Sequence, residues 1–311
     1  MKQFAVMDGH CDTAVELFRK KLPLEESSLN VSLRRAEKLP GYVQFFAFCT
    51  VWMKGEPDKE ALFRKVHSYF GGELEKNRER IRLCLNAAEA EAILEKGGCG
   101  AFLSLEGAES IDCDPGRLEQ AYAAGIRMIA PTWNEPNALS GSCMTGEGLS
   151  AQGKEFARRA QQLGIVLDVS HLSERGFWDL CDIAEKPFVA SHSNSAAICP
   201  HMRNLTDDQF RALCDVGGTA GLNLYGGFLT EKTATYEDVY RHLDHFLSIS
   251  GGGHVALGGD LDGCSILPEG FTGVDNYNDL AQFLADKGMN ERVLDALYNQ
   301  SLMEVLKTCI I

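Results

Sequence analysis

Short apolar segments alternate with longer amphipathic ones along almost the whole 311-residue chain. Eight apolar segments have the length and composition of buried strands, at 4–8, 41–51, 100–105, 126–130, 164–169, 187–190, 218–224 and 254–259. The stretch 81–85 is a candidate for a further short strand. Between the strands, apolar positions recur at helical spacing, as do Leu62, Val66 and Phe70 within 56–79. The pattern therefore predicts strands that alternate with helices.

The predicted strands are apolar on both faces, which is typical of a parallel sheet covered by helices. Eight strand–helix units in 311 residues predict a single (β/α)8 barrel of the TIM type, spanning 1–311, with C-terminal helices within 277–308 packed on it. A doubly wound open sheet is the alternative. No Gly-x-Gly-x-x-Gly motif follows the first strand, which favours the closed barrel.

Histidines and carboxylates stand at the ends of five of these strands. In chain order they are His10, Asp12, Glu106, His171, His192 and Asp260. Because all strand C-termini open onto one face of a barrel, we expect the six side chains to meet there. A lone histidine at a strand end is more often packed or hydrogen-bonded, but an acidic cluster without cations would repel itself.

The number of candidate ligands predicts more than one metal ion. Three imidazoles and three carboxylates exceed the three protein ligands that are usual for one catalytic zinc ion. The excess points to two ions that share a carboxylate, and Glu106 is the candidate bridge.

Six short segments together resemble the membrane dipeptidase (renal dipeptidase) family of zinc metallopeptidases, which belong to the amidohydrolase-type barrels. The segments are Asp8-Gly9-His10-Cys11-Asp12, Leu105-Glu106-Gly107, Asp168-Val169-Ser170-His171, Ser191-His192-Ser193, Arg203-Asn204 and Gly258-Gly259-Asp260-Leu261-Asp262-Gly263. They occur in the family's order, from the first strand to the end of the eighth. The resemblance implies a metallo-dipeptidase with two Zn²⁺ ions at the C-terminal face of the strands.

The resemblance also implies a ligand set. One zinc ion would be bound by His10 and Asp12, the other by His171 and His192, and both by Glu106. In the implied mechanism, a hydroxide that bridges the two ions attacks the peptide carbonyl.

Two further residues match the family's substrate-binding and acid/base positions. Arg203 would bind the C-terminal carboxylate of the substrate, a task that suits a planar guanidinium. Asp260 would act as the catalytic acid/base. Asp262 is the competitor for that role, but we expect it to lie in a turn.

The segment after the fourth strand departs from the family pattern. Family members often carry a histidine there, whereas this chain has Trp133 and Asn134, and no histidine between His67 and His171. We expect Asn134 or Trp133 to line the pocket, with Tyr225 as a further substrate contact. The side-chain and stereochemical preference for dipeptides stays open, as does the β-lactam cleavage shown by some members.

Composition limits the partners and the compartment. A net charge of −14 argues against nucleic-acid or anionic-membrane partners. The eleven cysteines never form a Cys-x-x-Cys motif, which favours reduced thiols. We find no candidate for a signal peptide, a membrane span or the family's C-terminal lipid anchor. We therefore expect a cytoplasmic enzyme that acts on small dipeptides, and analogy with related barrels suggests a homodimer.

Two other functions stay open. The first is hydrolysis of another amide, ester or lactone on the same pair of metal ions. In the sequence, only Arg203 distinguishes a dipeptidase from this alternative, because it calls for a free carboxylate on the substrate. The second is a non-catalytic metal- or ligand-binding barrel, which the presence of Asp260 and of every candidate ligand disfavours.

Overall fold

The computed structural model describes residues 3–26, 28–53, 55–56 and 58–310. Eight parallel strands form the barrel: β1 (Val6–Cys11), β2 (Tyr42–Phe48), β4 (Cys99–Glu106), β5 (Ile126–Ala130), β6 (Val166–Leu167), β7 (Val189–Ala190), β8 (Thr219–Leu222) and β9 (Val255–Leu257). They pair in the order β6-β5-β4-β2-β1-β9-β8-β7. A parallel bridge between Asp168 and Val189 joins β6 to β7 and closes the ring. The predicted (β/α)8 barrel is confirmed.

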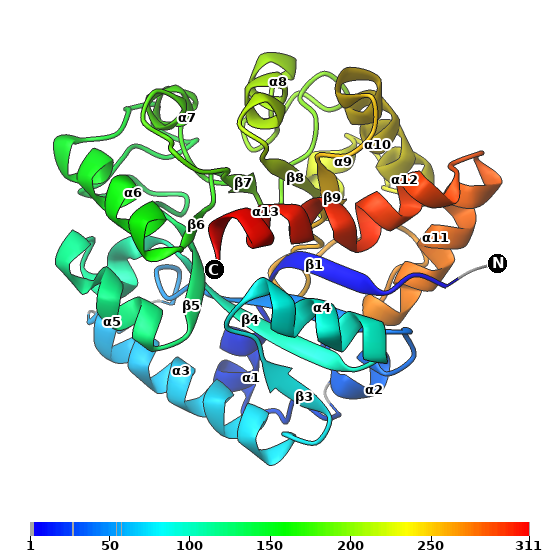
Figure 1. Ribbon diagram of the computed structural model, residues 1–311, viewed down its shortest axis with the longest axis horizontal. Coiled ribbons are helices and arrows are strands. Elements are labelled where there is room, and N and C mark those ends of the chain that lie inside the picture. Colours follow the sequence, from blue (N-terminus) through cyan, green and yellow to red (C-terminus); the bar gives the residue numbers. More distant parts are fainter. Residues whose placement is uncertain (1–2, 27, 54, 57, 311) are drawn as a thin grey trace.

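Helices surround the strands on all sides (Figure 1). They are α1 (Thr13–Lys20), α2 (Leu33–Ala36), α3 (Lys59–Lys76), α4 (Ala87–Lys96), α5 (Leu118–Ala123), α6 (Ala151–Leu163), α7 (Glu174–Cys181), α8 (Asp207–Asp215), α9 (Gly226–Leu229), α10 (Tyr236–Ser250), α11 (Tyr277–Asp286), α12 (Glu291–Asp295) and α13 (Ser301–Cys309). Short 3₁₀ turns lie at Ala108–Ile111, Pro115–Arg117 and Val274–Asn276. The candidate strand at 81–85 is present as β3 (Ile81–Leu83), which pairs with the start of β4 and lies outside the ring.

The capping residues explain where several helices begin. Ser150, Ser173 and Thr206 each accept a hydrogen bond from the backbone N–H three residues on, and Thr206 forms a full capping box with Gln209. Thr13 does not cap α1, because it is already helical and its hydroxyl donates to Asp262 Oδ2 at 2.6 Å.

Helix α13 closes the N-terminal end of the barrel. Its apolar side chains pack against inward-facing residues of the strands, including Met7 and Phe45. Its ends contact residues that precede or begin strands: Thr219 donates to the Ser301 carbonyl, and Lys186 to that of Cys309. With this end filled, the opposite end is left for a site. Within the predicted C-terminal helical region, a π-helical turn, Ala296–Gln300, lies between α12 and α13.

Strands β6 and β7 are shorter than the predicted segments 164–169 and 187–190. The physical reason lies in Asp168, which follows β6. Its Oδ1 accepts hydrogen bonds from the backbone N–H groups of Ser170 and Ser191, so these amides are bound by a side chain rather than by a neighbouring strand. Within the described residues, no helix is long and apolar enough to cross a membrane.

Candidate metal centre

Five of the six strand-end residues converge at the C-terminal mouth of the barrel. They are His10, Asp12, Glu106, His171 and His192, and each is at most 6% exposed. His10 belongs to β1 and Glu106 to β4, while the others lie directly after β1, β6 and β7. The expectation that side chains from distant strands meet at one face therefore holds for these residues.

Two groups of candidate ligands share Glu106. His10 Nε2 lies 3.6 Å from Asp12 Oδ2 and 3.6 Å from Glu106 Oε2. The other oxygen, Glu106 Oε1, lies 2.8 Å from His171 Nε2 and 3.5 Å from His192 Nε2. Both groups are compact enough to hold a metal ion. One carboxylate thus presents a different oxygen to each group, as a bridging ligand does.

The unsatisfied atoms of the cluster fit metal ions. His10 Nε2 and Asp12 Oδ1 are buried without a hydrogen-bond partner among the described residues. The Nε2 atoms of His171 and His192 lie 3.0 Å apart. Buried polar atoms that lack a protein partner are rare and call for an explanation. Imidazole nitrogen and carboxylate oxygen are ligands that zinc accepts.

The electrostatics of the two groups differ. Burial opposes a charge on His10, but the carboxylates of Glu106 and Asp12 outweigh it and raise the pKa of His10 to about 10. Burial, together with positive charge nearby, holds the pKa values of His171 and His192 well below the usual value. The first group therefore attracts a positive charge, and the second presents unprotonated imidazoles.

A cavity of about 640 Å³ opens above the cluster. Arg203, Asn134 and Tyr225, the predicted substrate contacts, all line it. Arg203 is 5% exposed, and its Nη1 has no hydrogen-bond partner among the described residues. Asn134 Oδ1 also lies 2.9 Å from His171 Nδ1, so it contacts a candidate ligand directly. Trp133, the alternative to Asn134, lines the same cavity.

Asp260, the sixth strand-end residue, lies in the wall of this cavity. Its Oδ2 accepts a hydrogen bond from Asn223 Nδ2 at 3.0 Å. Burial raises the pKa of Asp260 to about 7, a value that suits a group that accepts and returns a proton near neutrality.

Asp262 lies in a turn, as expected. Its carboxylate accepts hydrogen bonds from the Thr13 hydroxyl and from the backbone N–H groups of Asn30 and Val31. Those bonds attach the turn after the last strand to the first helix and to the loop before α2, which is a structural role. His242 and His245, two of the remaining histidines, contact Ser195, Leu229 and Asp207 in helices and loops away from the cluster.

Sequence reasoning missed Asp8, which lies under the first group of ligands. Its carboxylate accepts hydrogen bonds from the backbone N–H groups of His10 and Gly259, from Gln44 Nε2 and from the Tyr277 hydroxyl. It thereby fixes the backbone beside a candidate ligand and next to the predicted acid/base. The signal in the sequence is a carboxylate inside an otherwise apolar strand.

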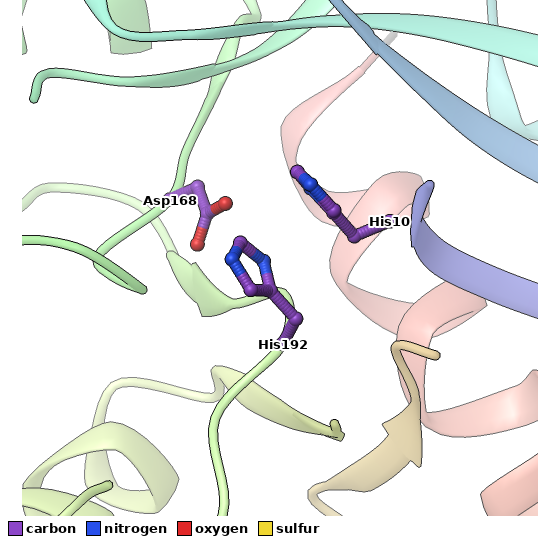
Figure 2. A group of neighbouring side chains, drawn as sticks. All are labelled: His10, Asp168 and His192. Carbon is purple, nitrogen blue, oxygen red and sulfur yellow. The ribbon is translucent and has the colours of Figure 1, made fainter. Parts of the chain in front are cut away.

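Two further residues were also missed, Gly263 and Asp168. A Cβ atom at Gly263 would lie 2.0 Å from Asp12 Oδ2 and 2.7 Å from Asp260 Oδ1, so only glycine allows the two carboxylates their positions. Asp168 offers an oxygen within 4.8 Å of nitrogen atoms of His10 and His192 (Figure 2).

A parallel barrel with imidazoles and carboxylates gathered at its C-terminal face has the architecture of a metal-dependent barrel enzyme. The chain belongs to the membrane dipeptidase family (peptidase family M19), whose family profile matches residues 1–309. It is therefore a metallopeptidase that acts on dipeptides.

Solved structures and curated relatives agree with this assignment. A dipeptidase AC of family M19 has a TM-score of 0.91 and 28% identity over 99% of both chains. A *Rhodobacter sphaeroides* metallopeptidase, bound to a phosphinate mimic of L-Ala-D-Ala, has a TM-score of 0.90 and 27% identity, over 99% of this chain and 100% of its own. An uncharacterised *Klebsiella pneumoniae* protein of the pqqA 5′ region is 39% identical over 73% of this chain and 89% of its own length. An uncharacterised *Schizosaccharomyces pombe* dipeptidase is 32% identical over 70% of this chain and 54% of its own length.

Proposed function

We propose that this protein is a zinc-dependent dipeptidase that holds two zinc ions, bridged by Glu106, and cleaves unblocked dipeptides. The observation that carries the proposal is the division of Glu106 between two ligand groups, with Oε2 toward His10 and Oε1 toward His171 and His192. His10 and Asp12 hold one ion, and His171 and His192 hold the other. When bound, a pair of such cations lowers the pKa of a water molecule toward neutrality and polarises a carbonyl group.

Arg203 selects the substrate by its free C-terminal carboxylate. The guanidinium is buried, lies 3.2 Å from His171 Nε2 and has no carboxylate partner among the described residues. A buried cation of this kind favours an anionic ligand, because leaving the charge uncompensated is costly. Because the guanidinium lies beside His171, a carboxylate bound to it would lie next to the candidate ligands, which supports a short substrate such as a dipeptide.

Asp260 moves the proton. It accepts a proton from the attacking water and passes it to the nitrogen of the leaving amino acid. The amide of Asn223 fixes the carboxylate for this task through the bond to Oδ2. The aromatic side chains of Trp133, Tyr225 and Phe228 form walls of the same cavity.

The alternative is a hydrolase of other amides, esters or lactones on the same ions. A panel of unblocked dipeptides and their C-terminal amides separates the two, with L- and D-residues at the second position. We expect cleavage of unblocked dipeptides by the zinc-loaded protein, and a drop of about 10–100-fold in kcat/KM for the amides, since a hydrogen bond to a charged group contributes about 1.5–3 kcal/mol. Equal rates on both would favour the alternative.

A further inference from the structure

A single hydroxyl group links the His192 ring to a buried carboxylate. Ser191 Oγ lies 2.7 Å from His192 Nδ1 and donates a hydrogen bond to Asp168 Oδ2 at 2.5 Å. All three residues are at most 3% exposed. Figure 2 shows the Asp168 carboxylate directed toward the His192 ring. The contact to Nδ1 lies on the nitrogen that does not face Glu106.

Donor and acceptor counting fixes the protonation of this ring. A serine hydroxyl carries one hydrogen, and an ionised carboxylate only accepts. Because Ser191 gives its hydrogen to Asp168, its oxygen can only accept from His192. The hydrogen of the neutral ring therefore sits on Nδ1, which leaves the lone pair on Nε2, 3.5 Å from Glu106 Oε1.

Asp168 is held rigidly enough to impose this arrangement. Its Oδ1 accepts hydrogen bonds from the backbone N–H groups of Ser170 and Ser191, at 3.0 and 2.9 Å, and from the Ser170 hydroxyl at 2.7 Å. Its Oδ2 accepts from Ser191 Oγ. Four donors occupy the carboxylate, so Asp168 supports the ligands rather than joining them.

We propose that Ser191 and Asp168 are positioning residues that hold His192 as the Nδ1-protonated tautomer and strengthen its Nε2 as a metal ligand. The identity of the ion rests on the function proposed above. A carboxylate that accepts the second ring hydrogen of a ligating histidine orients the ring and raises its basicity. Here the carboxylate acts through a hydroxyl. Among the described residues, the candidate ligand His171 has only the neutral amide oxygen of Asn134 at its Nδ1.

Two serine-to-alanine variants separate this role from general stabilisation. Ser191→Ala removes the hydroxyl that contacts the ring. Ser170→Ala removes another hydroxyl from the same carboxylate, but that hydroxyl reaches His192 at its backbone N–H and not at its ring; it also lies 3.3 Å from Ser191 Oγ. We expect both variants to lower the thermal stability of the metal-free protein.

The zinc affinity should fall in Ser191→Ala but not in Ser170→Ala. We expect chelator competition to show a loss of about 10–100-fold in Ser191→Ala, the range for lost supporting partners of metal ligands. Ser170→Ala should change it less than threefold, and Ser191→Thr, which keeps the hydroxyl, should restore most of the loss. Equal affinities in the two alanine variants would overturn the proposal.

The tautomer itself can be observed without any metal. In ¹⁵N NMR spectra of the metal-free protein, the neutral His192 ring should be Nδ1-protonated in the wild type and should shift toward a mixture of tautomers in Ser191→Ala. An unchanged tautomer in the variant would overturn the inference even if the enzyme proves to be a zinc dipeptidase. Conversely, the tautomer result stands by itself if the dipeptide panel fails.

Discussion

The two halves of the candidate metal centre share one carboxylate but differ in charge. The half built from β1 pairs His10 with the carboxylates of Asp12 and Glu106, and these raise the pKa of His10 to about 10. The half that follows β6 and β7 contains two imidazoles, and their pKa values are lowered by burial and by positive charge nearby.

This difference assigns a separate task to each half. The acidic half compensates positive charge, and the imidazole half presents lone pairs next to Arg203, where the substrate carboxylate would bind. A different buried carboxylate holds the histidine of each half in place. Asp8 fixes the backbone of His10, whereas Asp168 reaches the ring of His192 through Ser191.

Removing the negative charge of Glu106, which both halves share, should have the largest effect on turnover. We expect Glu106→Gln to lower turnover by about 10³-fold or more, since metal ions contribute several kcal/mol to transition-state stabilisation. Bound zinc should fall below two ions per chain, as measured by elemental analysis. Glu109→Gln is the matched control, because Glu109 is a largely buried carboxylate that bonds to Asn137 rather than to the ligands. Full zinc content in Glu106→Gln would contradict the bridging role.

The second largest loss of turnover is expected for a variant of Asp260, which tests the chemical step separately from metal binding. Asp260→Asn should keep both ions, because the asparagine oxygen can still accept from Asn223, and should lose about 10²–10³-fold in kcat for want of a proton acceptor. Steady-state kinetics and zinc analysis on the same sample check this. Wild-type turnover in the variant would remove Asp260 from the acid/base role.

A smaller loss of kcat/KM is expected for a variant of Arg203, and it tests whether the substrate carboxylate binds beside the imidazole half. Arg203→Gln should lower kcat/KM by about 10–100-fold on unblocked dipeptides, the value of a hydrogen bond to a charged group. On the C-terminal amides, the variant and the wild type should differ little. If the variant lost as much on the amides as on the unblocked dipeptides, the arginine would have another function.

The smallest effect concerns the stability of the metal-free protein. The raised pKa of His10 gives stability that is fully present below about pH 6.5 and is lost as the pH rises toward 10. The lowered pKa values of His171 and His192 give stability that is present above about pH 6.5 and is lost as the pH falls below it. In thermal unfolding from pH 5 to 10, the Tm of His10→Gln should fall less on the alkaline side than the Tm of the wild type. We expect a difference of roughly 2–4 °C, which corresponds to about 1 kcal/mol. Parallel curves for variant and wild type would argue against the charge difference between the halves.

The fold could be predicted from the sequence because its signal is local. Strands such as β2 and β4 are long, apolar runs, and the serine and threonine caps mark helix starts directly. The lengths of β6 and β7 could not be predicted, because they depend on a hydrogen bond that Asp168 accepts from the backbone N–H of Ser191, just after the next strand. The π-helical turn before α13 had no sequence signal that we can identify.

The candidate ligands could be predicted because each one ends a strand, and barrel geometry brings strand ends together. The residues that hold these ligands in place could not be predicted from the sequence. The partners of Asp8 include Gln44, Gly259 and Tyr277, which are distant in sequence and meet only in the folded chain. Asn134 was predicted to contact the substrate, and its bond to His171 depends on the path of the loop after β5.

The most direct test of the account is a crystal structure of the zinc-loaded protein, with anomalous scattering measured at the zinc edge. The account predicts two zinc ions per chain, one near His10 and Asp12 and one near His171 and His192, with one Glu106 oxygen on each. A single ion, or two ions that do not share Glu106, would contradict it.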